Sequence, residues 1–146
     1  MKKLLIITLL VFITSFIKGQ TVYLTLSPVD MGVGMRYDRH ISDFGVYVSG
    51  IYGNYHLYHG YIRDHWKISS GLTLTLPERG YDTYFSIGIC AHKYGDTFLP
   101  LEYNLRRVLS PLSFEVGAGA VMGRIVAGFR IDPYKWDSAI DIGFKF

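Results

Sequence analysis

Cysteine and charge are both scarce in this chain of 146 residues. The single cysteine, Cys90, excludes an internal disulfide and a metal site built from four cysteines. Only 18% of the residues are charged and 49% are hydrophobic, with 16 glycines and 12 tyrosines, which argues against a disordered chain and against a coiled coil. Beyond residue 20 no window sustains the i, i+3, i+4, i+7 apolar repeat of a helix. The length allows one domain.

The first 19 residues have the pattern of a secretory signal peptide. Lys2 and Lys3 precede an apolar run over residues 4–12 that only Thr8 interrupts, and a small residue, Gly19, follows. We therefore expect residues 1–19 to be a signal peptide, cleaved near Gly19, and residues 20–146 to be the folded domain. The alternative is a retained anchor, but the uninterrupted apolar stretch is shorter than the roughly 20 residues a spanning helix needs.

Removing this segment abolishes the apparent basicity of the chain. Lys2, Lys3 and Lys18 leave with it, so the net charge of +3 falls to zero, with twelve basic and twelve acidic residues. The composition therefore gives no argument for a nucleic-acid partner.

The rest of the chain alternates apolar and polar residues with period two, the pattern of β-strands. Turn-forming residues such as Pro77, Gly80 and Pro133 separate the alternating segments. Eight strands are predicted, over residues 31–38, 44–49, 66–76, 81–92, 99–106, 112–120, 125–131 and 140–146. Val22 to Leu26 also alternates, either as a separate strand or as an extension of the first one across Pro28.

Periodicity alone does not tell whether the apolar face is a soluble core or a lipid-facing surface. Three features favour a membrane barrel: the apolar faces carry almost no charge, the opposite faces mix charges with small residues, and the last alternating strand runs to Phe146. A fourth feature is that aromatic residues gather near predicted strand ends, as in an interfacial girdle. They are Tyr52, Tyr55, Tyr58, Tyr61, Trp66, Tyr81, Tyr94, Tyr134 and Trp136.

The ending Ile140-Asp141-Ile142-Gly143-Phe144-Lys145-Phe146 resembles the C-terminal strand of bacterial outer-membrane barrels. The chain beyond residue 19 resembles small eight-stranded barrels of the OmpA/OmpX type, and the stretch Asp132 to Trp136 resembles those of Bacteroidetes-like bacteria. The resemblance implies an outer-membrane location, with membrane lipid and the barrel-insertion machinery as partners. It also implies that Ile140, Ile142, Phe144 and Phe146 form the insertion signal. We expect a structural or surface-interaction role, with no cofactor and no enzymatic activity.

The predicted fold is thus all-β: an eight-stranded antiparallel up-and-down transmembrane β-barrel preceded by a signal peptide. Eight strands leave an interior just wide enough for side chains to fill, so we expect a plugged lumen without an open pore. The polar faces place ten charged residues there: Arg36, Asp38, Lys67, Asp82, Glu102, Arg106, Glu115, Arg130, Asp141 and Lys145. Buried charges must be paired, and a network of Glu115 with Arg130 and Asp141 is predicted.

One feature departs from the family pattern. Family members carry long external loops, whereas the longest predicted connection, near Asn54 to Asp64, falls on the periplasmic side if both termini are periplasmic. Either that hairpin is extended strand, or the strand count is off by one.

Two other functions are weighed. A secreted soluble barrel would place Val116, Phe129 and Ile142 around a small apolar ligand. A lipid A-modifying enzyme is suggested by His40 and Ser42, which are similar to the His-x-Ser motif of outer-membrane lipid A deacylase barrels, but the pair falls in a predicted turn.

The remaining histidines and the cysteine give only weak signals. His56, His59 and His65 suggest a metal site only faintly, and we interpret them as surface or interfacial residues. His92 and Cys90 are predicted to fill the lumen.

Overall fold

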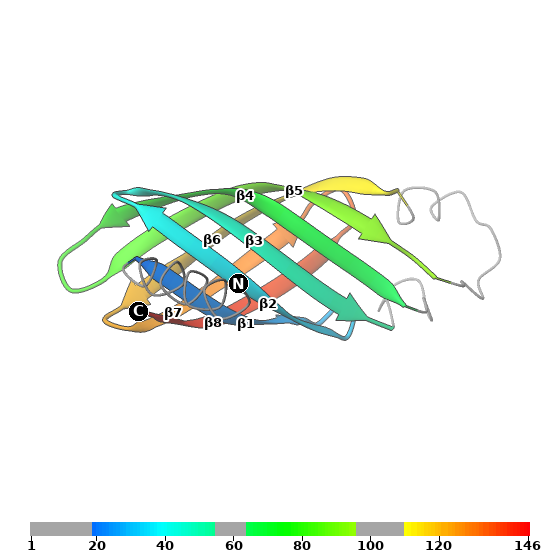
Figure 1. Cartoon of the computed structure of the whole chain (residues 1–146), viewed down its shortest axis with the longest axis horizontal. Coiled ribbons are helices and arrows are strands. Elements are labelled where there is room, and N and C mark those ends of the chain that lie inside the picture. Colours follow the sequence, from blue (N-terminus) through cyan, green and yellow to red (C-terminus); the bar gives the residue numbers. More distant parts are fainter. Residues whose placement is uncertain (1–18, 55–63, 96–109) are drawn as a thin grey trace, which may run out of the picture.

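The computed structural model describes residues 19–54, 64–95 and 110–146, and shows a closed antiparallel barrel in which each strand pairs with the next (Figure 1). The predicted all-β, eight-stranded up-and-down architecture is confirmed. No helix among the described residues has the length and apolarity to cross a membrane. The strands are β1 (Gln20–Ser27), β2 (Gly32–Ile41), β3 (Phe44–Gly53), β4 (His65–Pro77), β5 (Asp82–Lys93), β6 (Leu112–Met122), β7 (Ile125–Asp132) and β8 (Asp137–Lys145).

The first strand of the barrel is Gln20–Ser27, which the sequence left open. It is separate from β2, because a turn over residues 28–31 reverses the chain and brings Ser27 opposite Gly32. β1 also pairs with β8, from Thr21 opposite Lys145 to Leu26 opposite Ile140, and this pairing closes the barrel. The predicted strand over 99–106 lies outside the described residues, and β5 pairs directly with β6. The count of eight was therefore right, but the assignment of its members was shifted.

This shift resolves the departure from the family's loop pattern. The start of β1, the end of β8 and the short connections 42–43, 78–81 and 123–124 lie at one end of the barrel, which we call the terminal end. The turns 28–31 and 133–136 lie at the other, the loop end, as do the strand ends at Gly53, His65, Lys93 and Leu112. With β1 counted, β3 ends and β4 begins at the end opposite the start of β1, so the sequence-based placement of the Asn54 to Asp64 connection on the side of the termini was wrong.

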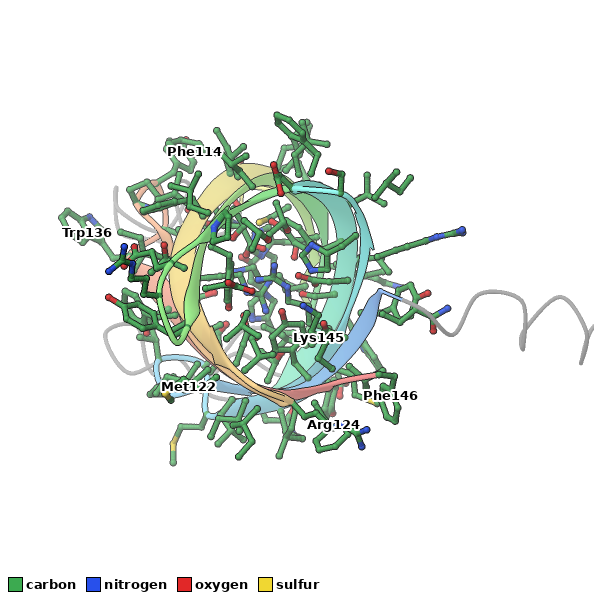
Figure 2. All side chains as sticks on the ribbon, turned by 90° about the vertical axis from the view of Figure 1, so that its left-hand side faces the viewer. Phe114, Met122, Arg124, Trp136, Lys145 and Phe146 are labelled. Atoms are coloured by element: carbon green, nitrogen blue, oxygen red, sulfur yellow. The ribbon has the colours of Figure 1, made fainter. Side chains whose placement is uncertain are left out.

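The distribution of polarity is inverted relative to a water-soluble protein. Along β3 every second residue is buried; the intervening ones are exposed, including Phe44, Val46 and Val48, except the half-buried Tyr52. Figure 2 looks down the barrel: nitrogen and oxygen atoms crowd the interior, while Phe114, Met122 and Phe146 point outward. Large apolar residues are exposed on all eight strands. Alternation over a closed sheet therefore gives a charged interior and an apolar outer surface.

Tyrosine rings lie across glycines inside the barrel. Tyr47 of β3 is opposite Gly71 of β4, which is opposite Gly88 of β5. A Cβ atom on Gly88 would lie 2.0 Å from Tyr47 Oη, and one on Gly71 would lie 2.7 Å from Tyr47 Cε1. Glycine at both positions thus leaves room for a ring that spans two neighbouring strands.

The same arrangement recurs at Tyr84, where it gives a testable prediction. A Cβ on Gly128 would lie 1.7 Å from Tyr84 Oη. We expect Gly128→Ala to lower the free energy of unfolding in detergent micelles by about 1–3 kcal/mol through overpacking. Gly50→Ala is the matched control, because a Cβ there meets nothing within 4 Å.

A second variant tests the cause of that loss. Tyr84 Oη has no hydrogen-bond partner in the described part of the chain, so Tyr84→Phe removes the clashing atom without breaking a bond. Gly128→Ala/Tyr84→Phe should recover much of the stability. Equal losses in the single and double variants would contradict the packing explanation.

The expected aromatic girdle is observed in part. Trp66, Tyr81, Tyr134 and Trp136 are exposed on the outside, and the Tyr52 ring packs on Trp66 with centroids 4.7 Å apart. Tyr94 was assigned wrongly: its ring stacks on the buried His65 at 4.4 Å. The remaining girdle candidates, Tyr55, Tyr58 and Tyr61, lie outside the described residues.

Candidate functional site: the charged interior

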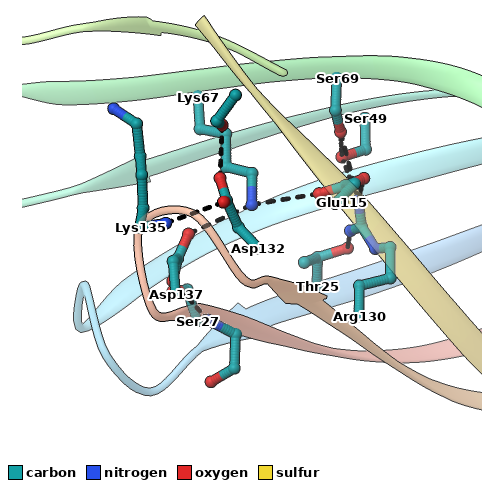
Figure 3. Close-up of polar contacts among 12 residues, drawn as sticks. Thr25, Ser27, Ser49, Lys67, Ser69, Glu115, Arg130, Asp132, Lys135 and Asp137 are labelled. Carbon is teal, nitrogen blue, oxygen red and sulfur yellow. Dashed lines mark hydrogen bonds and ion pairs between the residues drawn. The ribbon is translucent and has the colours of Figure 1, made fainter. Parts of the chain in front are cut away.

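Arg130 of β7 is the centre of the interior network (Figure 3). Its Nε and Nη2 donate to the two carboxylate oxygens of Asp141, at 2.7 and 2.9 Å. Its Nη1 donates to Glu115 Oε1 at 2.6 Å and to Ser49 Oγ at 2.9 Å, so one guanidinium bridges two carboxylates. All four side chains are buried, and the bidentate geometry is the strong form of such a pair.

Arg36 of β2 forms a second, similar centre. Its Nε and Nη2 donate to the two oxygens of Asp38, at 2.6 and 2.8 Å, and its Nη1 donates to Asp141 at 3.2 Å. Three tyrosine rings surround the guanidinium, the nearest being Tyr47 at 4.2 Å from the ring centroid. The other two are Tyr23, at 5.1 Å, and Tyr84, at 5.5 Å. Such faces stabilise a desolvated guanidinium.

Lys67 of β4 extends the network toward the loop end. Its Nζ lies 3.1 Å from Glu115 Oε2 and 3.1 Å from Asp137 Oδ2. Charges of opposite sign now alternate without interruption through the barrel. In order of contact they are Asp38, Arg36, Asp141, Arg130, Glu115, Lys67 and Asp137. Each charge has an opposite neighbour, which offsets the cost of burying it.

A second group of contacts, the loop-end relay, lies beyond Lys67. His65 Nδ1 is 3.3 Å from Asp30 Oδ2, and His65 Nε2 is 3.1 Å from His92 Nδ1. His92 Nε2 is 2.7 Å from Ser113 Oγ, which in turn contacts Asp132 Oδ2. The two imidazoles are nearly parallel, with 10° between their planes. The relay therefore connects the carboxylate of the turn between β1 and β2 with the carboxylate at the end of β7, through two buried rings and a hydroxyl.

The turn after β7 contributes a further buried cation. Asp132 Oδ1 accepts from the backbone N–H groups of Tyr134 and Lys135, at 3.0 Å each, which fixes the turn. Lys135 Nζ points back into the barrel and contacts Tyr94 Oη and the carbonyl of Ser110. Burial lowers the pKa of Lys135 to about 8, although nearby carboxylates oppose this change.

Of the ten charged residues predicted to line the lumen, the structure brings five together around Arg36 and Arg130. Arg36, Asp38, Glu115, Arg130 and Asp141 are fully buried and joined by the contacts above. Glu102 and Arg106 lie outside the described residues. Of the other charged positions on the predicted polar faces, Lys67 is buried, whereas Asp82 and Lys145, at the terminal end, are half-buried.

Five interior residues were missed or misplaced. Strand periodicity gives no direction in or beside turns, where Asp30, Asp132, Lys135 and Asp137 lie. His65 was wrongly interpreted as a surface or interfacial residue. His65 is in phase with Lys67 on the same strand, two residues apart, and this signal would have placed it inside.

The predicted insertion-signal residues share the outer face of the last strand. Ile140, Ile142, Phe144 and Phe146 are all exposed, and the rings of Phe144 and Phe146 meet edge to face with centroids 5.3 Å apart. Their neighbour Asp141 points inward to Arg130.

The His-x-Ser motif does not form a hydrogen-bonded pair in the structure. His40 is half-buried at the terminal end, with Nδ1 3.5 Å from Thr75 Oγ1, whereas Ser42 is exposed in the following turn with φ of 62°. The expectation that this motif falls at a hairpin connection agrees with the backbone.

Comparison of the chain with protein-family models, with curated proteins and with solved structures gives no significant match.

Proposed function

We propose that this chain is an integral outer-membrane β-barrel protein with a closed, side-chain-filled lumen and a structural or surface-interaction role. The observation that carries the proposal is the inverted polarity of the barrel. Apolar residues such as Leu72, Ile87 and Phe129 are exposed in the middle of strands, while paired charges fill the interior. An exposed apolar surface that encircles a protein is unfavourable in water and favourable in lipid.

Closure of the sheet supports the same proposal. The hydrocarbon core supplies no hydrogen-bond partners, so every backbone N–H and C=O of a spanning segment must pair within the protein. Pairing of β1 with β8 satisfies both strands that would otherwise be edges. Strands of 8 to 13 residues also have lengths that suit a tilted span.

The proposed orientation places the terminal end in the periplasm and the loop end outside the cell. The short connections at the terminal end and the long ones at the loop end match the usual arrangement of such barrels. The loop end would then be the surface presented to partners, while membrane lipid surrounds the strands.

A network of paired charges also explains why the proposed role is structural and non-conducting. Arg36 of β2 and Arg130 of β7 share Asp141 of β8, and Lys67 of β4 joins the carboxylates of β6 and β8 across the lumen. A lumen crossed by such bridges holds the barrel in shape and leaves its centre filled.

The soluble alternative is disfavoured by where its ligand-lining residues lie. A barrel that encloses an apolar ligand needs Phe129 and Ile142 inside, but these residues are 49% and 54% exposed on the outer surface. A lipid A deacylase built on His40 and Ser42 is also disfavoured, since these residues lie at the end proposed to be periplasmic and make no mutual hydrogen bond.

Fractionation of cells that produce the full chain tests the proposal. We expect the protein in the outer-membrane fraction, resistant to carbonate extraction, and running at different apparent masses before and after boiling, because folded barrels resist detergent. Release into the soluble fraction by carbonate would contradict the membrane location and favour the soluble barrel.

A further inference from the structure

Three potential metal ligands meet at the inner end of the loop-end relay. Cys90 of β5, His92 of the same strand and Asp132 of β7 are buried, and one ligand atom from each lies within 4.8 Å of the other two. His92 Nε2 and Asp132 Oδ2 are 3.7 Å apart. Ligands at about 2.0–2.3 Å from a tetrahedral ion lie roughly 3.3–3.8 Å from one another. The separation of His92 and Asp132 already falls in this range, and Cys90 Sγ lies within 4.8 Å of both ligand atoms.

The hydrogens of the relay point to a missing positive charge at this place. Four contacts join Asp30, His65, His92, Ser113 and Asp132 in sequence. With both imidazoles neutral, only three hydrogens are available for these four contacts: one N–H on each ring and the O–H of Ser113. One contact is then between two acceptors, unless the relay gains a proton or a cation takes the place of a hydrogen.

The relay also fixes the orientation and the tautomer of the His92 ring, as a metal-binding histidine requires. If Asp30 accepts from His65 Nδ1, then His65 Nε2 accepts from His92 Nδ1. The lone pair of His92 Nε2 is then left for the site, where Ser113 Oγ lies at 2.7 Å and Asp132 Oδ2 at 3.7 Å. Metal-bound histidines characteristically donate their second ring N–H to such a partner, which holds the ring and its tautomer.

The charge of the barrel interior favours a cation there as well. Among the described residues that are buried, six are acidic and four are basic. The acidic ones are Asp30, Asp38, Glu115, Asp132, Asp137 and Asp141, and the basic ones are Arg36, Lys67, Arg130 and Lys135. A divalent ion that binds Cys90 as the thiolate adds one net positive charge and reduces this excess.

We propose that Cys90, His92 and Asp132 bind a divalent, borderline-soft metal ion of the Zn²⁺ class inside the barrel, with Ser113 or a water as the fourth ligand. A thiolate with an imidazole is the donor set of Zn²⁺ and disfavours Mg²⁺ and Ca²⁺, which prefer oxygen ligands. On binding, the Cys90 thiol loses its proton to solvent, and the ion replaces the contact of His92 Nε2 with Ser113.

Titration of the full chain, folded in detergent, with ZnCl₂ and separately with CoCl₂ tests this site. We expect one Zn²⁺ per chain, unaffected by excess Mg²⁺ or Ca²⁺. The Co²⁺ complex should show thiolate-to-metal charge-transfer absorption, which only ligation by Cys90 explains, because no other cysteine exists. No binding, or a Co²⁺ complex without that absorption, would overturn the proposal without any variant and without bearing on the membrane location.

Three variants locate the site. Cys90→Ser, His92→Gln and Asp132→Asn should each weaken Zn²⁺ binding by more than the roughly 10–100-fold typical of losing an outer-shell partner. His40→Gln, a half-buried histidine at the terminal end, is the matched control and should bind as the unaltered chain does. Undiminished binding by all three variants, each checked for the folded band on an unboiled gel, would place the ion elsewhere and refute the assignment.

Discussion

Replacing Arg130 with methionine is expected to lower the free energy of unfolding by about 3–5 kcal/mol, the range for removal of one partner from a buried ion pair. Arg130 is 1% exposed and donates to both Glu115 and Asp141. Methionine keeps much of the side-chain volume but leaves these carboxylates without their shared cation. Equilibrium unfolding by guanidinium in detergent micelles, together with the temperature at which the folded gel band is lost, measures the effect.

Three further variants identify the cause of that loss. Arg124→Met is the matched control, because Arg124 is exposed in the turn between β6 and β7, and it should change stability by no more than about 0.5 kcal/mol. Glu115→Ala should also lower heat resistance, since Arg130 and Lys67 each lose a carboxylate. The double variant Glu115→Ala/Arg130→Met should lose less than the sum of the single losses, because the groups are coupled. An unchanged melting temperature in Arg130→Met would show that the network does not hold the barrel together.

Replacing Ile87 with arginine is expected to cost about 2–4 kcal/mol when the barrel is folded into phosphatidylcholine vesicles, the range for a cationic side chain on the lipid face at the bilayer midplane. Ile87 lies in the middle of β5, between Leu72 and Val116 on the neighbouring strands, and is 59% exposed. Guanidinium unfolding from the vesicles measures the loss.

The matched control is Met122→Arg. Met122 is also 59% exposed but lies at the end of β6, where the cost should fall to about 0–1 kcal/mol. The pair therefore holds exposure constant and varies only the depth along the barrel. If both arginines changed stability by less than about 0.5 kcal/mol, as at a water-exposed surface, the outer surface would not face lipid.

The sequence by itself predicted which residues share a face. Period-two alternation placed Glu115 and Arg130 on the polar face and Phe114 and Phe129 on the apolar face, and the structure has them so. This property is local, because successive side chains of any strand point to opposite sides. The same rule would have placed His65 inside, in phase with Lys67, had the predicted strand begun one residue earlier.

Strand membership was decided by tertiary pairing. Val22 to Leu26 and residues 99–106 alternate equally well, and period-two alternation does not choose between them. Pairing of β1 with both β2 and β8 assigns Gln20–Ser27 to the closed barrel. That one assignment also reversed the end of the barrel at which β3 ends and β4 begins.

The partners of each interior charge were likewise decided only by the closed barrel. Arg36 meets Asp141 across 105 positions of sequence, and Tyr47 meets Glu115 across 68. Periodicity predicts that a side chain points inward, but the depth and direction at which it meets another depend on register and closure, which involve strands far apart in the chain. The sequence therefore determined an inverted barrel with a charged interior, and the three-dimensional closure alone decided that its charges alternate and that Cys90, His92 and Asp132 converge.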